Sequence, residues 1–287
     1  MNEGTIPLSG QAIGSQEDDA LRQDVREELS ARTEEPLTPH SFFWRVIGFL
    51  LNLGMFLVLF QLYKLVRKTY ISRGETVGYE HAEQIIGWQK SLHIFFEPDL
   101  QAWILDRPEW VIRYLNHYYV GFMPLFYASC AAALLFSPVR FRFWRRVFLC
   151  SMVLALPWYL IYPLAPPRFM PQYGFIDTLM VYGPKYFSSD GLVAANQYAA
   201  MPSMHIGWTT IAALMLWTCI PKVKGIPIGP ILGTLHISIM TLTVMATGNH
   251  YFLDAVGGWI IIGGAILLAL FLTDRFPFRL PRWFSPT

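Results

Sequence analysis

Long apolar segments recur along the chain after residue 40, separated by short polar stretches. Each is long enough to cross about 30 Å of hydrocarbon as a helix, and a helix satisfies its own backbone polar groups where no water is present. The segments cover residues 44–63, 111–136, 147–164, 202–220, 228–247 and 252–272. This pattern predicts an all-α, polytopic membrane protein with six transmembrane helices.

Residues 78–107 have a different pattern, in which Trp88, Leu92 and Trp103 stand among charged and amide side chains. Tryptophan favours the membrane–water interface, and an amphipathic helix lies in that plane. We predict an interfacial amphipathic helix, broken near Pro98. It either guides a lipid head group toward the site or packs as a connecting element.

The two ends of the chain are polar. A segment of such composition buries too little apolar surface to fold alone. We predict a disordered cytoplasmic tail at residues 1–40, a six-helix membrane catalytic domain at 41–274 and a short cytoplasmic tail at 275–287. The first residues lack the basic start and apolar core of a signal peptide.

The placement of lysine and arginine predicts the orientation in the membrane. Basic residues gather in the predicted loops 138–146 and 221–227 and in the tail 275–287, which share one side of the six-span plan with the N-terminus. That side is predicted to be cytoplasmic. Three basic residues after the first span, Lys64, Arg67 and Lys68, lie on the opposite side and disagree with this orientation. The long loop at 165–200 then lies on the extracytoplasmic or lumenal side.

Composition agrees with a membrane protein. Of 287 residues, 54% are hydrophobic and 15% are charged, and the net charge is +2. Soluble domains carry nearer a quarter charged residues. No basic run with interleaved aromatic residues suggests a nucleic-acid partner. The partners we expect are membrane lipids, and the sequence does not define an oligomeric state.

Two short stretches at the edges of apolar segments carry the candidate chemistry. AAMPSMHIGW contains His205, and TGNHYFLDAVGGW contains His250, with Asp254 four residues later. Positions i and i+4 of a helix share one face, so Asp254 can fix the tautomer of the His250 ring. This set suits phosphoryl transfer, in which His250 attacks phosphorus, Asp254 stabilises the resulting cation and His205 acts as acid and then as base.

The oxyanions of a phosphate need donors. Arg168 can supply a bidentate fork, and Ser203 precedes the free N–H groups at the start of a helix, which favour anions. Lys185 lies in the same loop as Arg168 and is a further candidate. Asp177 and Asn249 flank this set. The predicted substrate is a lipid phosphate, and water or an alcohol is the acceptor.

These motifs resemble a known family. MPSMH resembles the P-S-G-H motif of the type 2 phosphatidic acid phosphatase superfamily, and HYFLD resembles its last motif. The form HY-x-x-D and the preceding APPR are most similar to the branch containing inositol phosphorylceramide synthase, and sphingomyelin synthases share a similar arrangement. The resemblance implies a phosphatase or phosphotransferase with His250 as nucleophile, His205 as acid and base, Asp254 as orienting acid, and no metal or cofactor.

Three positions depart from the pattern of the superfamily. Val244 stands where the last motif has an arginine, Ile161 stands where the first motif has a lysine, and Met204 replaces the glycine before the histidine. The predicted phosphate clamp is therefore less basic than that of the phosphatases. Such a clamp suits a phosphodiester or a transferase with an alcohol acceptor, and it is also compatible with a monoester.

Other uses of the same residues stay open. Two histidines and one carboxylate can form a metal site, which would make the protein a metal-dependent membrane hydrolase. Histidines can also relay protons in a transporter, although the paired halves typical of many transporters are not evident. His236, in the middle of a predicted span, has no patterned partner and is interpreted as a packing residue.

Overall fold

The computed structural model describes residues 74–184 and 198–275, with scattered positions between 43 and 61. The elements belong to the unit Trp44–Thr287, one of two in the chain. They are helices: α3 (Gly74–Ser91), α4 (Glu97–Leu105), α5 (Glu109–Val120), α6 (Phe122–Phe136), α7 (Pro138–Ile161), α8 (Thr178–Tyr182), α9 (Met204–Cys219), α10 (Ile228–Ala246) and α11 (Phe252–Arg275), with the 3-10 turns η2 (Pro167–Phe169) and η3 (Pro171–Tyr173). The prediction of an all-α protein is confirmed for this part of the chain.

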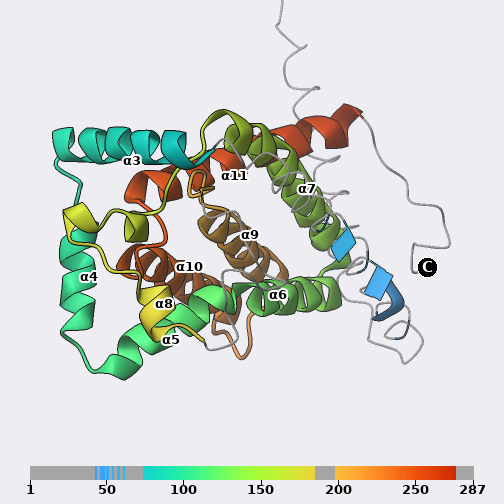
Figure 1. Cartoon of the computed structure of the whole chain (residues 1–287). Coiled ribbons are helices and arrows are strands. Elements are labelled where there is room, and N and C mark those ends of the chain that lie inside the picture. The colour runs from blue at the N-terminus through green and yellow to red at the C-terminus, as the bar shows by residue number, and fades with distance from the viewer. Residues whose placement is uncertain are drawn as a thin grey trace, which may run out of the picture. The chain divides into compact units, whose positions relative to one another are not determined.

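Helix α9 is central to the arrangement in Figure 1, because it packs against α6, α7, α10 and α11. Its side chains are apolar on every side, and Ile206, Ile211 and Met215 are all buried. A helix that is hydrophobic all round belongs inside a bundle. Ser203 caps its start, since the Ser203 hydroxyl oxygen accepts the N–H of Ile206 at 3.4 Å. This cap places His205 in the first turn.

Among the described residues, α7, α10 and the segment Phe252–Leu272 of α11 are long and apolar enough to cross a membrane. Helices α5 and α6 add a fourth candidate if they count as one span, although they are bent by 57°. Helix α9 has 16 residues, which corresponds to about 24 Å. The number of six spans is therefore not confirmed: the first predicted span lies mostly outside the described residues, and α9 is short.

The arginines predicted to lie in a loop at 138–146 belong to helix α7 instead. Pro138 occupies the first turn of this helix, where its fixed φ suits the helix and its missing N–H is not needed. Arg140 donates from its guanidinium to the carbonyl of Thr218, near the end of α9. A cation is favourable at the C-terminal end of a helix, so this arginine ties α7 to α9.

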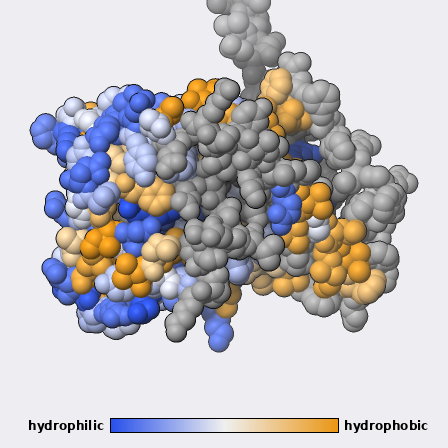
Figure 2. All heavy atoms as spheres, in the orientation of Figure 1, coloured by the Kyte–Doolittle hydropathy of each residue, from blue (hydrophilic) through white to orange (hydrophobic). Residues whose placement is uncertain are grey.

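The predicted interfacial helix is two helices, α3 and α4, separated by residues 92–96. The chain turns at His93, whose φ is 57°. Pro98 lies in the first turn of α4, not at the break, again because a proline is tolerated there. Figure 2 shows polar and apolar residues together over α3 and α4. Trp88 and Trp103 are each 53% exposed.

Glycine at position 258 permits close contact between α11 and the start of α9. A Cβ atom there would lie 2.4 Å from the carbonyl oxygen of Ser203. At Gly257 the nearest atom to such a Cβ would be the flexible end of Met201, at 3.4 Å. The two neighbouring glycines therefore differ in the space that they leave.

We expect Gly258→Ala to lower the melting temperature of the purified protein, because Ser203 must move away from α11. Gly257→Ala should melt at or slightly above the wild-type temperature, since alanine is the better helix former by about 1 kcal/mol. Thermal unfolding in detergent, followed by circular dichroism, measures both. Equal melting of the two variants would contradict the close contact at position 258.

Candidate active site

The loop between α10 and α11 carries His250 and is folded by its own backbone. The carbonyl of Val244 accepts the N–H groups of both Asn249 and His250 at 3.0 Å. Gly248 adopts a φ of 68°, a left-handed conformation that costs glycine little and commonly ends a helix. His250 is thereby held next to the last turn of α10.

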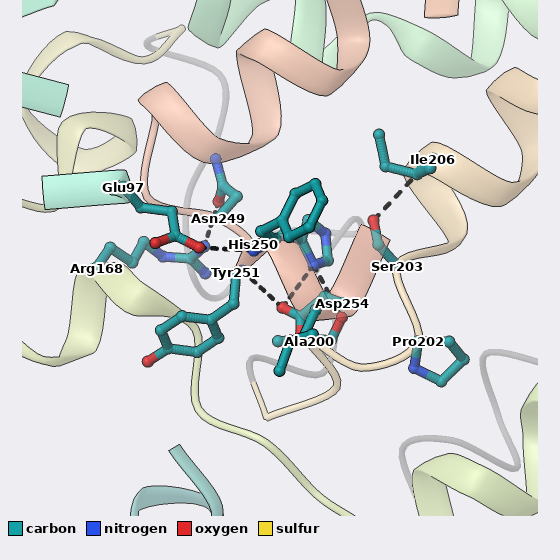
Figure 3. Close-up of polar contacts among 12 residues, drawn as sticks. Glu97, Arg168, Ala200, Pro202, Ser203, Ile206, Asn249, His250, Tyr251 and Asp254 are labelled. Atoms are coloured by element: carbon teal, nitrogen blue, oxygen red, sulfur yellow. Dashed lines mark hydrogen bonds and ion pairs between the residues drawn. The ribbon is translucent and has the colours of Figure 1, made fainter. Parts of the chain in front are cut away.

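The His250 ring has a defined proton position. Its Nδ1 lies 2.8 Å from the carbonyl oxygen of Ala200 and 3.4 Å from Oδ2 of Asp254 (Figure 3). A carbonyl oxygen only accepts, so Nδ1 carries the hydrogen and Nε2 keeps its lone pair. Within the described part of the chain, the buried Nε2 has no hydrogen-bond partner. It is the nitrogen that suits a nucleophile.

Asp254 joins the two helices that carry the site. Its Oδ2 accepts the N–H of Tyr251 at 2.8 Å, and its backbone carbonyl accepts the N–H of Ser203 at 2.9 Å. The carboxylate is fully buried. Through these bonds the residue ties the start of α11 to the cap of α9, and the two predicted motifs meet there.

The structure brings His205 and His250 together, with 5.6 Å between their ring centroids. Tyr119 of α5 stacks on the His205 ring at 4.1 Å, and Phe122 of α6 lies at 4.4 Å. These aromatic residues were missed from the sequence. The signal that points to them is Gly121 between them, where the predicted second span bends.

Arg168 lies against the His250 loop. Its backbone N–H donates to the carbonyl of Gly248 at 2.8 Å, and one guanidinium nitrogen donates to the side-chain oxygen of Asn249. The Nε atom lies 3.5 Å from Oδ2 of Asp177. These side-chain contacts use two of the five guanidinium donors. Asp177 and Asn249 thus hold the predicted phosphate-binding arginine in place.

The two other predicted phosphate ligands are Ser203 and Lys185. Ser203 is buried, and its oxygen is engaged as the cap of α9, so its hydroxyl hydrogen remains as a donor. Lys185 lies outside the described residues. Val244, where the superfamily pattern has an arginine, is a fully buried core residue.

Two buried polar side chains, Thr178 and Asn116, hold the loop that carries His250. They were not predicted from the sequence. The hydroxyl of Thr178 donates to the carbonyl of Thr247 at 3.0 Å, and Asn116 donates to the carbonyl of Thr178 at 3.2 Å. Buried polar side chains in otherwise apolar surroundings need such partners. Asn116, a polar residue near the start of the predicted span 111–136, is the sequence signal for this contact.

His236 also has a partner. Its Nδ1 is hydrogen-bonded to the hydroxyl of Tyr118, which joins α10 to α5. This contact joins two helices outside the His250 loop. It agrees with the interpretation of His236 as a packing residue. For the metal alternative, no group of three or more His, Cys, Asp or Glu side chains is arranged as metal ligands within residues 74–184 and 198–275.

Residues 83–268 match the family described as the PAP2 superfamily, and the chain belongs to this superfamily. Together with the apolar helices, this membership indicates an integral membrane protein of the lipid phosphatase or phosphotransferase class.

One relative is the inositol phosphorylceramide synthase catalytic subunit of Schizosaccharomyces pombe, which is 23% identical over 176 residues. The match covers 56% of this chain and 37% of that protein. No solved structure matches. The predicted resemblance to the branch that contains inositol phosphorylceramide synthase is confirmed.

We expect Thr178→Val to destabilise the protein by about 1–3 kcal/mol, because the carbonyl of Thr247 loses its buried donor. Thr234→Val is the matched control, since the exposed Thr234 hydroxyl bonds to the carbonyl of Pro230 in its own helix. Denaturant or thermal unfolding in detergent measures the difference. If both variants unfold alike, the hydrogen bond from Thr178 to Thr247 does not stabilise the protein.

Proposed function

We propose that this protein transfers the phosphoryl or phosphoalcohol group of a lipid phosphate through a phosphohistidine on His250. The observation that carries the proposal is the state of the His250 ring. Nδ1 is held by Ala200 and Asp254, while Nε2 has no partner among the described residues and the His205 ring lies nearby.

In the first step, the Nε2 lone pair of His250 forms a bond to phosphorus as the bond to the leaving oxygen breaks. His205 gives its proton to that oxygen. The ring of His250 becomes a cation, which the Asp254 carboxylate stabilises. In the second step, His205 takes the proton of water or an alcohol, whose oxygen attacks phosphorus and releases His250.

The phosphate oxygens are bound by Arg168 and by the start of α9. The guanidinium donors that Asn249 and Asp177 leave unused can form a charged fork. The hydroxyl hydrogen of Ser203 and the first N–H groups of α9 add donors and the positive end of a helix dipole. Lys185 is a further proposed ligand.

The acceptor decides between hydrolysis and transfer, and both use the same histidine pair. The name of the fission yeast relative describes a synthase of inositol phosphorylceramide. Together with the weakly basic clamp, this name favours transfer of the group to an alcohol. Hydrolysis of a phospholipid or a polyprenyl phosphate is the other outcome that the same histidine pair allows.

We propose six spans, cytoplasmic termini and a site at the extracytoplasmic or lumenal face.

The test uses purified protein in lipid nanodiscs with a panel of lipid phosphates labelled in the phosphate. We expect His250→Ala to lower turnover at least about 10³-fold. His205→Ala should cost about 10²–10⁴-fold, as loss of a general acid does. Asp254→Asn should cost less, because the Ala200 carbonyl still holds Nδ1. His117→Ala is the control, since that side chain is exposed on α5.

The intermediate gives a second measurement. A rapid acid-free quench should leave label on a peptide containing His250, stable in base and lost in acid, and absent from His250→Ala. Full activity of His250→Ala, or label on another residue, would refute the mechanism. Product analysis by mass spectrometry separates hydrolysis from transfer.

We expect turnover to be unchanged by a chelator, because every step above uses only side chains of this chain. The measurement is the rate before and after incubation with EDTA and dialysis. A loss that added Zn²⁺ restores would establish the metal-dependent alternative. Wild-type protein inactive toward every substrate of the panel would favour the transporter alternative, tested by flux across reconstituted vesicles.

A further inference from the structure

Helices α3 and α4 bury polar side chains and expose apolar ones. Gln89, Glu97 and Gln101 are each at most 1% exposed, whereas Trp88 of α3 and Trp103 of α4 are each 53% exposed. Burying an amide or a carboxyl group is costly unless it is hydrogen-bonded. Three such groups on two adjacent helices therefore need a structural reason, and their partners provide it.

The first set of partners lies at the start of α11. Oε1 of Glu97 accepts the N–H of Phe252 at 2.7 Å and the side-chain N–H of Gln89 at 2.6 Å. Oε1 of Gln89 accepts the N–H of Leu253 at 3.2 Å. The first N–H groups of a helix lack partners within it, so these two side chains satisfy two of them on α11.

Glu97 is well placed for this contact despite its burial. Burial raises the pKa of its carboxyl group above the ordinary value, while the hydrogen bonds from Gln89 and Phe252 lower it. The N-terminal end of a helix also attracts a carboxyl oxygen, because the helix dipole is positive there. The position thus favours a side chain with an acceptor oxygen at Oε1.

The second set of partners lies at the end of α10. Gln101, one turn after Glu97 on α4, donates to the carbonyl of Ala246 at 3.3 Å and to that of Ile176 at 3.2 Å. Its Oε1 accepts the N–H of Ile176 at 2.8 Å. Its amide also fills the space beside Gly248, where a Cβ atom would lie 2.9 Å away.

His250 lies between these two sets of contacts. We propose that Gln89, Glu97 and Gln101 are positioning residues, which hold the loop at 247–251 at both ends and so fix the place of His250. This inference rests on the proposed function, in which the nucleophilic nitrogen must face phosphorus. A misplacement of about 1 Å can cost on the order of 10²-fold in rate.

The test compares three variants of the full-length protein in nanodiscs. Glu97→Leu removes the acceptor for Phe252. Glu97→Gln keeps an oxygen that can accept the same two N–H groups. Asp99→Leu is the matched control, because it makes a similar change at an exposed position of the same helix.

The first readout is hydrogen exchange of peptides that cover residues 247–255, which does not depend on activity. We expect the Phe252 and Leu253 amides to exchange at least about tenfold faster in Glu97→Leu. Glu97→Gln and Asp99→Leu should match the wild type. Unchanged exchange in Glu97→Leu would overturn the proposed contacts.

The second readout is steady-state turnover of a lipid phosphate, expressed per folded protein. For Glu97→Leu we expect kcat to fall on the order of 10²-fold with a smaller change in KM, because Arg168 keeps its contact with Asp177 and the start of α9 keeps its donors. Glu97→Gln should keep kcat within about threefold. Equal losses in Glu97→Gln and Glu97→Leu, or an unchanged kcat in Glu97→Leu, would overturn the positioning role.

The two readouts also separate this inference from the proposed function. If wild-type protein turns over no lipid phosphate while exchange at Phe252 responds to Glu97→Leu, the contacts hold the loop and the proposed function is wrong. If wild-type protein is active and exchange does not respond, the function stands and the positioning role is wrong.

Discussion

The arrangement of the candidate site depends on one hydrogen bond, from Nδ1 of His250 to the carbonyl oxygen of Ala200 at 2.8 Å. It fixes the tautomer of the ring and leaves Nε2 as the basic nitrogen. Ala200 is itself placed by backbone pairing, because its N–H donates to the carbonyl of Leu164 at 3.2 Å. The segments before Arg168 and before Ser203 therefore meet at the histidine. Asp254 adds a carboxyl oxygen beside a ring whose orientation the Ala200 carbonyl already defines.

A second backbone contact brings α9 and α11 close together. The N–H of Ser203 bonds to the carbonyl of Asp254 at 2.9 Å, and Gly258 leaves room for the Ser203 carbonyl. The two histidines come from segments far apart in sequence, and this contact sets the distance between them. A side chain at position 258 would act on both motifs at once, because it would push Ser203, which precedes His205, away from the helix that carries Asp254.

The sequence predicted the helical class and the two histidine motifs, because apolar length and i to i+4 spacing are local properties. It did not predict the Ala200 carbonyl, since every residue has a carbonyl and only the fold selects one. It placed the arginines near Arg140 in a loop, because charge alone does not reveal that Pro138 starts a helix. Tyr119 and Glu97 were missed as neighbours of the site for a similar reason: their contacts join helices that the sequence does not place side by side.

The buried Val244 contributes to the site through its backbone. Its side chain lies in the core, and its carbonyl accepts the N–H groups of Asn249 and His250. Asn249 in turn engages Arg168. The histidine loop is thus ordered by backbone bonds and by one arginine shared with Asp177. In the proposed function, few positive charges would lie near the phosphate, so the donors at the start of α9 would carry more of the binding. A substrate with a single negative charge on phosphorus would then fit better than one with two.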